Sequence, residues 1–254
     1  MPKTFSGMQV TLRQLTGDTI DYRPLLKEIK KSEETKIVLD CDYEKIALIL
    51  HQATEIELLT DYQNYLITNI DVDKVNVEAY THQNVNITGL WIVDPDTQLV
   101  RKYLKKYPKT SLQGKNHPFF SENAFMRSCV QVFAKALNNL DSLSTIQPMA
   151  LSCDAAGSWP DGEKVLSYLK EVDHMGLSGE IRFDADGFRT DFQLDLMEKY
   201  RGRLKKTGIW KLEAGINYTM TASEIGTQMI EKLANKTLRV VTTPVRNMNS
   251  SFFS

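Results

Sequence analysis

The stretch KIVLDCDYEKIALILHQATEIELLTDYQNYLIT, residues 36–68, decides the fold class. Residues 36–40 form a short apolar run typical of a buried strand, and residues 65–68 form a second run of this kind. Between them, residues 43–59 place apolar side chains at helical spacing, which predicts an amphipathic helix. A strand, a helix and another strand in this order predict an α/β fold in which helices cover a parallel sheet.

The same pattern continues on both sides of this stretch. Upstream, residues 8–15 alternate like a strand, and residues 22–31 predict a helix with Pro24 in its first turn. Downstream, we expect a strand and three helices, at residues 87–93, 97–107, 121–140 and 164–172. The helix near residue 97 is expected to be capped by Asp96 or Thr97.

The longest predicted helix, residues 121–140, carries one apolar stripe that needs a partner. Its expected buried residues are Phe125, Cys129, Val132, Phe133, Ala136 and Leu137. Each large apolar side chain contributes roughly 1.5–3 kcal/mol when it is fully buried, so this stripe is expected to lie on a sheet.

After residue 178 the sequence no longer alternates strand and helix patterns and instead has the pattern of consecutive strands joined by turns. Residues 179–183, a turn at 184–187 and residues 188–197 predict an antiparallel hairpin, and residues 208–212 predict a further strand. Asp184 and Asp186 are similar to the start of a calcium loop, but Phe188 stands where the third ligand would be. A hairpin turn is therefore the favoured interpretation.

Composition excludes several classes of protein. The chain is 42% hydrophobic and 25% charged with a net charge of −1, which predicts a globular protein and gives no support for nucleic-acid binding. No apolar run reaches about 18 residues, and residues 1–10 lack the apolar segment of a secretory signal. The cysteines, Cys41, Cys129 and Cys153, are odd in number without CxxC spacing, which disfavours a zinc site.

The candidate catalytic residues are few. Asp40, Asp42 and Glu44 follow a predicted strand, where open α/β sheets bind ligands, and they could form an acid pair or a metal site. Acidic residues also cap the helix that follows, and capping with solvation is the favoured interpretation. The histidines, His51, His82, His117 and His174, follow no metal or triad spacing, and the chain has no GxSxG, GxGxxG or P-loop motif. We predict no catalytic residue, no cofactor and no metal.

Four N-x-S/T sequons bear on the compartment: Asn86, Asn217, Asn235 and Asn249. They accept glycans only if the chain enters the secretory route. A cytosolic protein with buried thiols remains the alternative on this evidence.

Several motifs together resemble the extracellular amino-terminal domain of kainate-type ionotropic glutamate receptors. The most specific are RQL, PLLKEIK and IVLDC near the start, GLSGEIRFD and GIW in the hairpin region, and NKTLRVVTT at residues 235–243. The resemblance implies a two-lobed fold of the type I periplasmic-binding-protein class. It assigns residues 8–93 and 177–215 to the second lobe and the helix at 121–140 to the first lobe.

The resemblance also implies how the chain is divided. Residues 1–216 correspond to a partial amino-terminal domain, 217–236 to a linker, and 237–254 to the first strand of the agonist-binding domain with a divergent tail. We expect truncation at both ends, with the second lobe mostly present and the first lobe largely missing. Residues 97–150 are therefore expected to be poorly supported. Cys153 matches a family cysteine whose disulfide partner lies outside this chain.

By this resemblance, the function is that of a non-catalytic glycoprotein domain. It would serve assembly with other glutamate receptor subunits, on the extracellular side of the plasma membrane at the synapse, in a parent that is a ligand-gated cation channel. The glutamate site and the membrane-spanning segments are not included. The alternatives are a soluble amino-acid-binding or peptide-binding receptor of the same fold and a cytosolic α/β enzyme using Asp40, Asp42 and Glu44.

Overall fold

The structure is a computed structural model of the 254-residue chain. It describes residues 10–15, 19–60, 63–80, 85–106, 121–149, 159–221, 223–224, 226–227 and 230. The chain divides into two compact units, Met1–Thr219 and Met220–Ser254. In the second unit, the side chains of Thr221 and Glu224 each accept a hydrogen bond from the other residue's backbone N–H, a reciprocal capping box. The first strand of an agonist-binding domain, expected within residues 237–254, lies outside the described residues.

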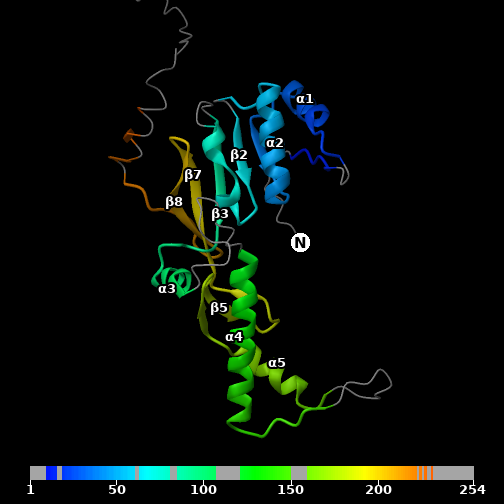
Figure 1. Ribbon diagram of the computed structural model, residues 1–254, viewed down its shortest axis with the longest axis vertical. Coiled ribbons are helices and arrows are strands. Elements are labelled where there is room, and N and C mark those ends of the chain that lie inside the picture. Colours follow the sequence, from blue (N-terminus) through cyan, green and yellow to red (C-terminus); the bar gives the residue numbers. More distant parts are fainter. Residues whose placement is uncertain are drawn as a thin grey trace, which may run out of the picture. The chain divides into compact units, whose positions relative to one another are not determined.

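A six-stranded mixed sheet dominates the first unit (Figure 1). Its strand order is β1-β2-β3-β7-β8-β9. The strands are β1 (Lys36–Leu39), β2 (Asn64–Ile67), β3 (Asn86–Trp91), β7 (Gln193–Tyr200), β8 (Arg203–Lys211) and β9 (Gly215–Tyr218). The first three are parallel to one another, and each later neighbouring pair is antiparallel. The predicted α/β class and its change from parallel to antiparallel pairing are confirmed.

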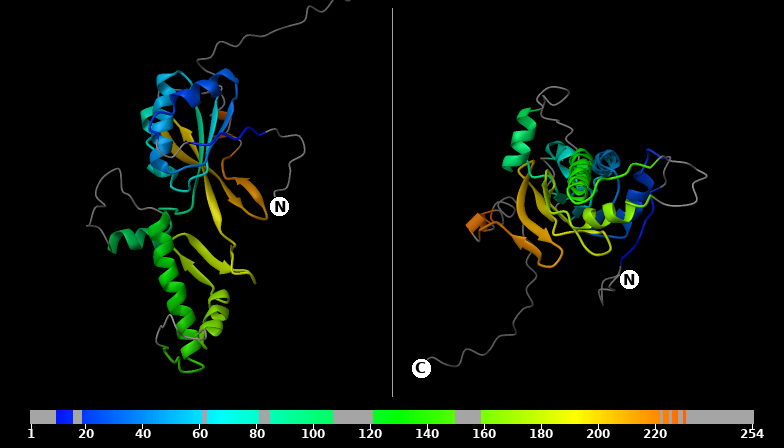
Figure 2. Two further views of the ribbon diagram at one scale, coloured as in Figure 1. Left: turned by 90° about the vertical axis from the view of Figure 1, so that its right-hand side faces the viewer. Right: turned by 90° about the horizontal axis from the view of Figure 1, so that it is seen from below.

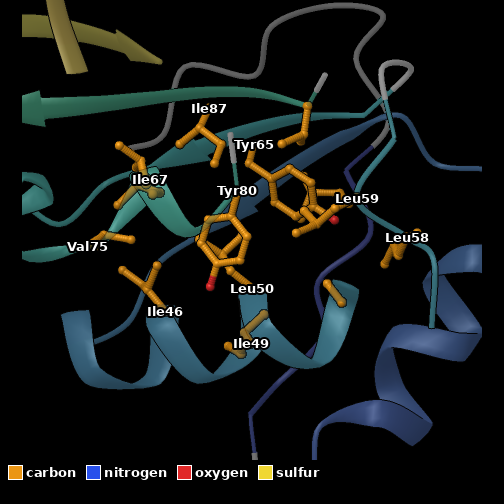
Figure 3. Packing of buried hydrophobic residues seen from close by; sticks show 14 of the residues in the cluster. Ile46, Ile49, Leu50, Leu58, Leu59, Tyr65, Ile67, Val75, Tyr80 and Ile87 are labelled. Carbon is orange, nitrogen blue, oxygen red and sulfur yellow. The ribbon is translucent and has the colours of Figure 1, made fainter. Parts of the chain in front are cut away.

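Two helices, α1 (Arg23–Lys31) and α2 (Tyr43–Glu55), pack on one face of this sheet (Figure 2). Their apolar residues share one core with alternate residues of the strands and with the short 3₁₀ helices η1 (Val72–Lys74) and η2 (Val77–Tyr80). Figure 3 shows Ile46 and Leu50 of α2 on the side of the helix that faces Tyr65 and Ile67 of β2. The apolar residues that recur at helical spacing in α2 and at every second position in β1 and β2 are thus buried in one core.

A second group of elements surrounds the long helix α4 (Ser121–Asp141). It contains α3 (Gln98–Lys106), α5 (Gly162–Lys170) and a three-stranded sheet of β4 (His174–Gly176), β5 (Gly179–Phe183) and β6 (Arg189–Thr190). Val132 and Ala136 of α4 are buried against Val172 and Ile181. We expected residues 97–150 to lack packing partners, and for the face of α4 that carries Val132 and Ala136 this expectation is wrong.

The buried face of α4 differs from the predicted stripe. Of the expected residues only Val132 and Ala136 are buried, whereas Cys129 is exposed and Phe133 keeps 47% of its surface exposed. The face that is buried consists of Ser121, Ala124, Ser128, Val132, Ala136 and Leu140. Small residues occupy it because β4 comes close: a Cβ added to Gly176 would lie 2.6 Å from Ser128 Oγ.

The strand predicted at residues 188–197 is two strands in two different sheets. β6 ends at Thr190, and Asp191 has a positive φ of 57°, so the chain turns before β7 begins. Phe188 is consequently exposed, while Leu194 is buried. The resemblance placed residues 177–190 in the lobe of the large sheet, but they pair beside α4 and that assignment is wrong.

The structure also tests the strand predicted at residues 8–15 and the turn predicted at residues 184–187. The described residues 10–15 form no strand, and Leu12 is almost fully exposed, so the predicted strand at 8–15 is wrong there. The turn at 184–187 is the predicted hairpin turn: the Asp184 carboxylate accepts a hydrogen bond from the Phe188 N–H, and Gly187 has a φ of 88°.

Candidate functional site

The carboxyl ends of β1, β2 and β3 lie at one edge of the large sheet because these strands are parallel. In open α/β sheets this edge is the place where ligands bind. Polar residues follow each of the three strands here. We call this set the carboxyl edge: Asp40, Asp42, Thr68, Asn69, Asp71 and Asp94.

The acidic residues singled out from the sequence take separate partners at this edge. Asp40 accepts a hydrogen bond of 2.6 Å from Thr68 Oγ1, and Glu44 accepts one of 3.0 Å from the Tyr43 hydroxyl. Asp42 occupies the N-cap position of α2 as predicted, but its side chain makes no capping hydrogen bond. Within the part of the chain that the structure describes, no three His, Cys, Asp or Glu residues are grouped to hold a metal ion. The described geometry therefore does not assemble these three residues into a catalytic or metal-binding cluster.

Asp71, two residues beyond Asn69, makes the most specific contact of the carboxyl edge. Its two carboxylate oxygens accept hydrogen bonds from the Ser121 N–H, at 2.7 Å, and the Ser121 hydroxyl, at 2.8 Å. Ser121 is the first residue of α4, so the carboxylate lies at the positive end of the helix dipole. A helix N-terminus beside the carboxyl edge is where an anionic ligand would be held, and here the chain's own carboxylate is in that position.

Lys206 of β8 joins the edge to the antiparallel part of the sheet. Its Nζ lies 2.8 Å from Asp195 Oδ1 and 3.4 Å from Asp94 Oδ2. Burial raises the pKa of Asp195 and outweighs the opposite influence of Lys206. Burial by itself lowers the pKa of Lys206, but Asp195 and Asp94 together reverse this and raise it. The three side chains hold the segment after β3 against β7 and β8.

Arg189 has a structural rather than a ligand-binding geometry. Its guanidinium donates hydrogen bonds to the carbonyl oxygens of Ser178, at 2.9 Å, and Glu180, at 2.8 Å. Burial lowers the pKa of Arg189. These contacts hold the turn between β4 and β5 in place.

The sequence reasoning missed Asp71, Ser121, Arg189 and Lys206. Asp71 had a usable signal, because it follows a predicted strand just as Asp40 does. The other three have no local signal, since their partners are distant in the chain or belong to backbone turns. Ser121, for example, is 50 residues away from Asp71.

The remaining candidate residues are scattered. Asn86 is the first residue of β3 and is half-buried, and Asn217 is exposed in β9. Asn235, Asn249, Cys153, His82 and His117 lie outside the described residues. His51 lies on α2 and His174 on β4, in separate clusters of the fold. Among the helices described, none combines the length and apolarity needed to cross a bilayer.

Comparison with known proteins supplies the wider context. Residues 3–200 match the family model described as "Receptor family ligand binding region". The chain is 31% identical over 245 residues to "Glutamate receptor ionotropic, kainate 1" of Mus musculus and 30% identical over 260 residues to the protein of that name from Homo sapiens. Each alignment covers 93% of this chain, which spans 29% and 28% of the length of these relatives. The resemblance drawn from the sequence motifs is confirmed.

Proposed function

Because the chain belongs to the receptor ligand binding region family, which is periplasmic-binding-protein-like, we propose that it is a non-catalytic extracellular domain of a kainate-type glutamate receptor. The observation that carries the proposal is the family match over residues 3–200 together with the similarity to the two kainate receptors over 93% of the chain. The parent protein is a ligand-gated cation channel, and this domain serves subunit assembly.

The geometry of the carboxyl edge supports a non-catalytic role. Asp40 is bonded to Thr68, Asp71 to Ser121, and Asp94 to Lys206. A catalytic acid pair needs two carboxyl groups that face one reacting atom. Here each carboxylate instead stabilises the contact between two segments of the chain.

The proposed organisation follows the sequence prediction. Residues 1–216 form the amino-terminal domain, 217–236 the linker, and 237–254 the first strand of an agonist-binding domain with its divergent tail. The end of the first compact unit at Thr219 supports a boundary in this region. Glutamate is bound elsewhere in the parent receptor and takes no residue from this chain.

The partners are other glutamate receptor subunits on the extracellular side of the plasma membrane at the synapse. In this setting Asn86, Asn217, Asn235 and Asn249 carry glycans. Cys153 forms a disulfide with a cysteine that lies outside this chain.

Co-expression of the full chain with a kainate receptor subunit tests the proposal. The chain is secreted behind a cleavable leader, and the association is measured by affinity capture followed by light scattering of the purified complex. We expect a complex with the kainate subunit and none with an unrelated secreted protein. Failure to associate, with the chain monodisperse and folded, would contradict the assembly role.

Calorimetry separates this proposal from the soluble binding receptor of the same fold. The alternative predicts that the chain alone binds a free amino acid or a short peptide. With Asp71 at the N-terminus of α4, we expect no heat of binding for L-glutamate or other amino acids. Saturable binding to the isolated chain would favour the alternative.

A further inference from the structure

The start of α4 holds a carboxylate that comes from a distant part of the chain. Asp71 lies 50 residues upstream of Ser121, yet both of its carboxylate oxygens accept hydrogen bonds from Ser121. An ordinary helix cap is supplied by the residue that directly precedes the first turn. Asp71 instead reaches the helix from another element, which is how the carboxylate of a separate ligand would reach it.

Ser121 presents two hydrogen-bond donors that fit one carboxylate group. Its backbone N–H and its hydroxyl donate at 2.7 and 2.8 Å, one to each oxygen of Asp71. Such charge-assisted hydrogen bonds are stronger than neutral ones, and the positive end of the helix dipole adds to them. Ser121 is only 3% exposed, so both donors are buried and would cost free energy if they had no acceptor.

The turn that carries Asp71 is held by further contacts. The Asp71 N–H donates a hydrogen bond of 2.9 Å to Asn69 Oδ1, and the Asp71 backbone forms a β-bridge with Trp91 at the end of β3. The next residue, Val72, is completely buried. The carboxylate is therefore already positioned by its own segment, and little conformational entropy is lost when it binds Ser121.

We propose that Asp71 is an internal ligand of the domain. Its carboxylate occupies a binding site for small carboxylates that Ser121 forms at the start of α4. By doing so it closes this part of the carboxyl edge to free carboxylates, including those of amino acids. The contact is autoinhibitory, and removal of the Asp71 side chain should open the site to a small carboxylate from solution.

Covalent attachment gives Asp71 a large advantage over a free carboxylate. Even a short flexible linker gives a tethered group an effective concentration that is roughly millimolar, and a turn fixed in the bound geometry gives more. Asp40 and Asp42 add negative charge to the same edge, which opposes the approach of a further anion. An acetate ion that replaces a deleted Asp71 side chain restores one negative charge and adds none to the original total.

Chemical rescue with acetate tests the proposal on the full chain, secreted from eukaryotic cells behind a cleavable leader. Hydrogen exchange of the amides at residues 121–124 is measured at neutral pH in sodium acetate and in sodium chloride of equal ionic strength. In chloride, we expect several-fold faster exchange in Asp71→Ala than in the wild type. In acetate, the rate in this variant should return toward that of the wild type. Acetamide, which is similar in shape but uncharged, should restore much less protection.

The wild type and two further variants show where acetate acts. The wild type should gain no protection from acetate, because Asp71 fills the site. Asp71→Asn should exchange faster but also gain none, because its amide still occupies the space and presents an NH₂ group to one of the Ser121 donors. Asp71→Ala combined with Ser121→Ala should lose most of the rescue, because the hydroxyl donor is then absent. A general salt effect would instead appear in all of these proteins.

Equal exchange of Asp71→Ala in acetate and in chloride would overturn the proposal and leave Asp71 as a helix cap alone. An acetate response of the same size in the wild type would also overturn it, because Asp71 would then not close the site. If Asp71→Ala is unfolded in chloride, recovery of its circular dichroism spectrum in acetate but not in acetamide supports the proposal, and failure to recover overturns it. Capture of a kainate subunit tests the proposed function separately, so either can fail without the other.

Discussion

The core under the large sheet and the interface under α4 are both buried, but by different kinds of side chain. Beneath the sheet, Ile46, Leu50, Tyr65 and Ile67 are large and fully enclosed. Under α4, most of the buried residues are serine or alanine, and the large apolar residues Met126, Val130 and Phe133 are exposed. Large side chains fill the space between a helix layer and a sheet, whereas a close backbone approach accepts only small ones.

The largest expected effect is a cavity in the sheet core. Ile67→Ala should lower the free energy of unfolding by about 2–5 kcal/mol, because Ile67 is completely buried. Val130→Ala on the exposed side of α4 should change it by less than about 0.5 kcal/mol. Urea unfolding followed by circular dichroism measures both. Equal losses would mean that α4 buries its large residues as well, and the contrast between the two regions would fail.

A smaller loss of stability is expected where the backbone of β3 at Gly89 comes close to the side chain of Val72. A Cβ added to Gly89 would lie 2.3 Å from Val72 Cγ2, and Val72 is fully buried, so Gly89→Ala should cost about 1–3 kcal/mol. The double variant with Val72→Ala should recover part of this loss in a double-mutant cycle. Strict additivity of the two changes would show that the clash is relieved elsewhere.

The next effect concerns the contact that joins the two regions. Asp71→Ala removes the carboxylate from the start of α4 and should cost about 0.5–2 kcal/mol, the usual range for losing a helix cap. Hydrogen exchange of the amides at residues 121–124 should become faster. Asp96→Ala is the matched control, because Asp96 is exposed and pairs only with Arg101 among the ion pairs of the described residues. Unchanged exchange at residues 121–124 would contradict the capping role.

The smallest effect is the pH dependence of the α4 region. His174 Nε2 lies 3.3 Å from Gln131 Oε1, and burial, followed by Lys135 and Arg127 on α4, lowers the pKa of His174, although Asp173 opposes this. The unfolded chain therefore binds more protons than the folded chain, and stability falls as the pH drops below the unfolded pKa of about 6.5. We expect a small loss of stability between pH 7 and pH 5, the smallest of the effects considered.

His174→Gln is the control for this pH effect. It should flatten the difference in stability between pH 7 and pH 5, while leaving stability at pH 7 nearly unchanged because the neutral ring and the amide are both uncharged. If the variant retains the full pH slope, another group causes it and the region under α4 contributes no titration of its own.

Much of the large sheet was predictable from local patterns. The alternation in residues 36–68 specified two parallel strands and the helix between them, because side-chain periodicity depends only on nearby residues. The same reasoning failed for the helix end near residue 59. α2 ends at Glu55, and Glu57 has a φ of 56°, while Leu58 and Leu59 are buried from the loop and extend the apolar pattern beyond the helix.

The site was less predictable than the fold. The rule for open sheets pointed to the carboxyl edge through Asp40 and Asp42, but it could not identify Ser121 or Lys206 as the partners of acidic residues there. Lys206 and Asp94 are separated by 112 residues, and no period or motif connects them. The assignment of residues 177–190 failed for a similar reason, because one backbone turn at Asp191 transfers the chain from the small sheet to the large one.

The sequence by itself determined the α/β class, the order of most helices and strands, and the receptor family, since these depend on local periodicity and on motifs. Only the tertiary structure decided which face of α4 is buried, which partner each carboxylate takes, and which strand residues share a face of the large sheet. The physical reason is that burial and hydrogen bonding are set by neighbours in space. Residues far apart in the chain acquire such neighbours only when the strands have their register and the helices have docked.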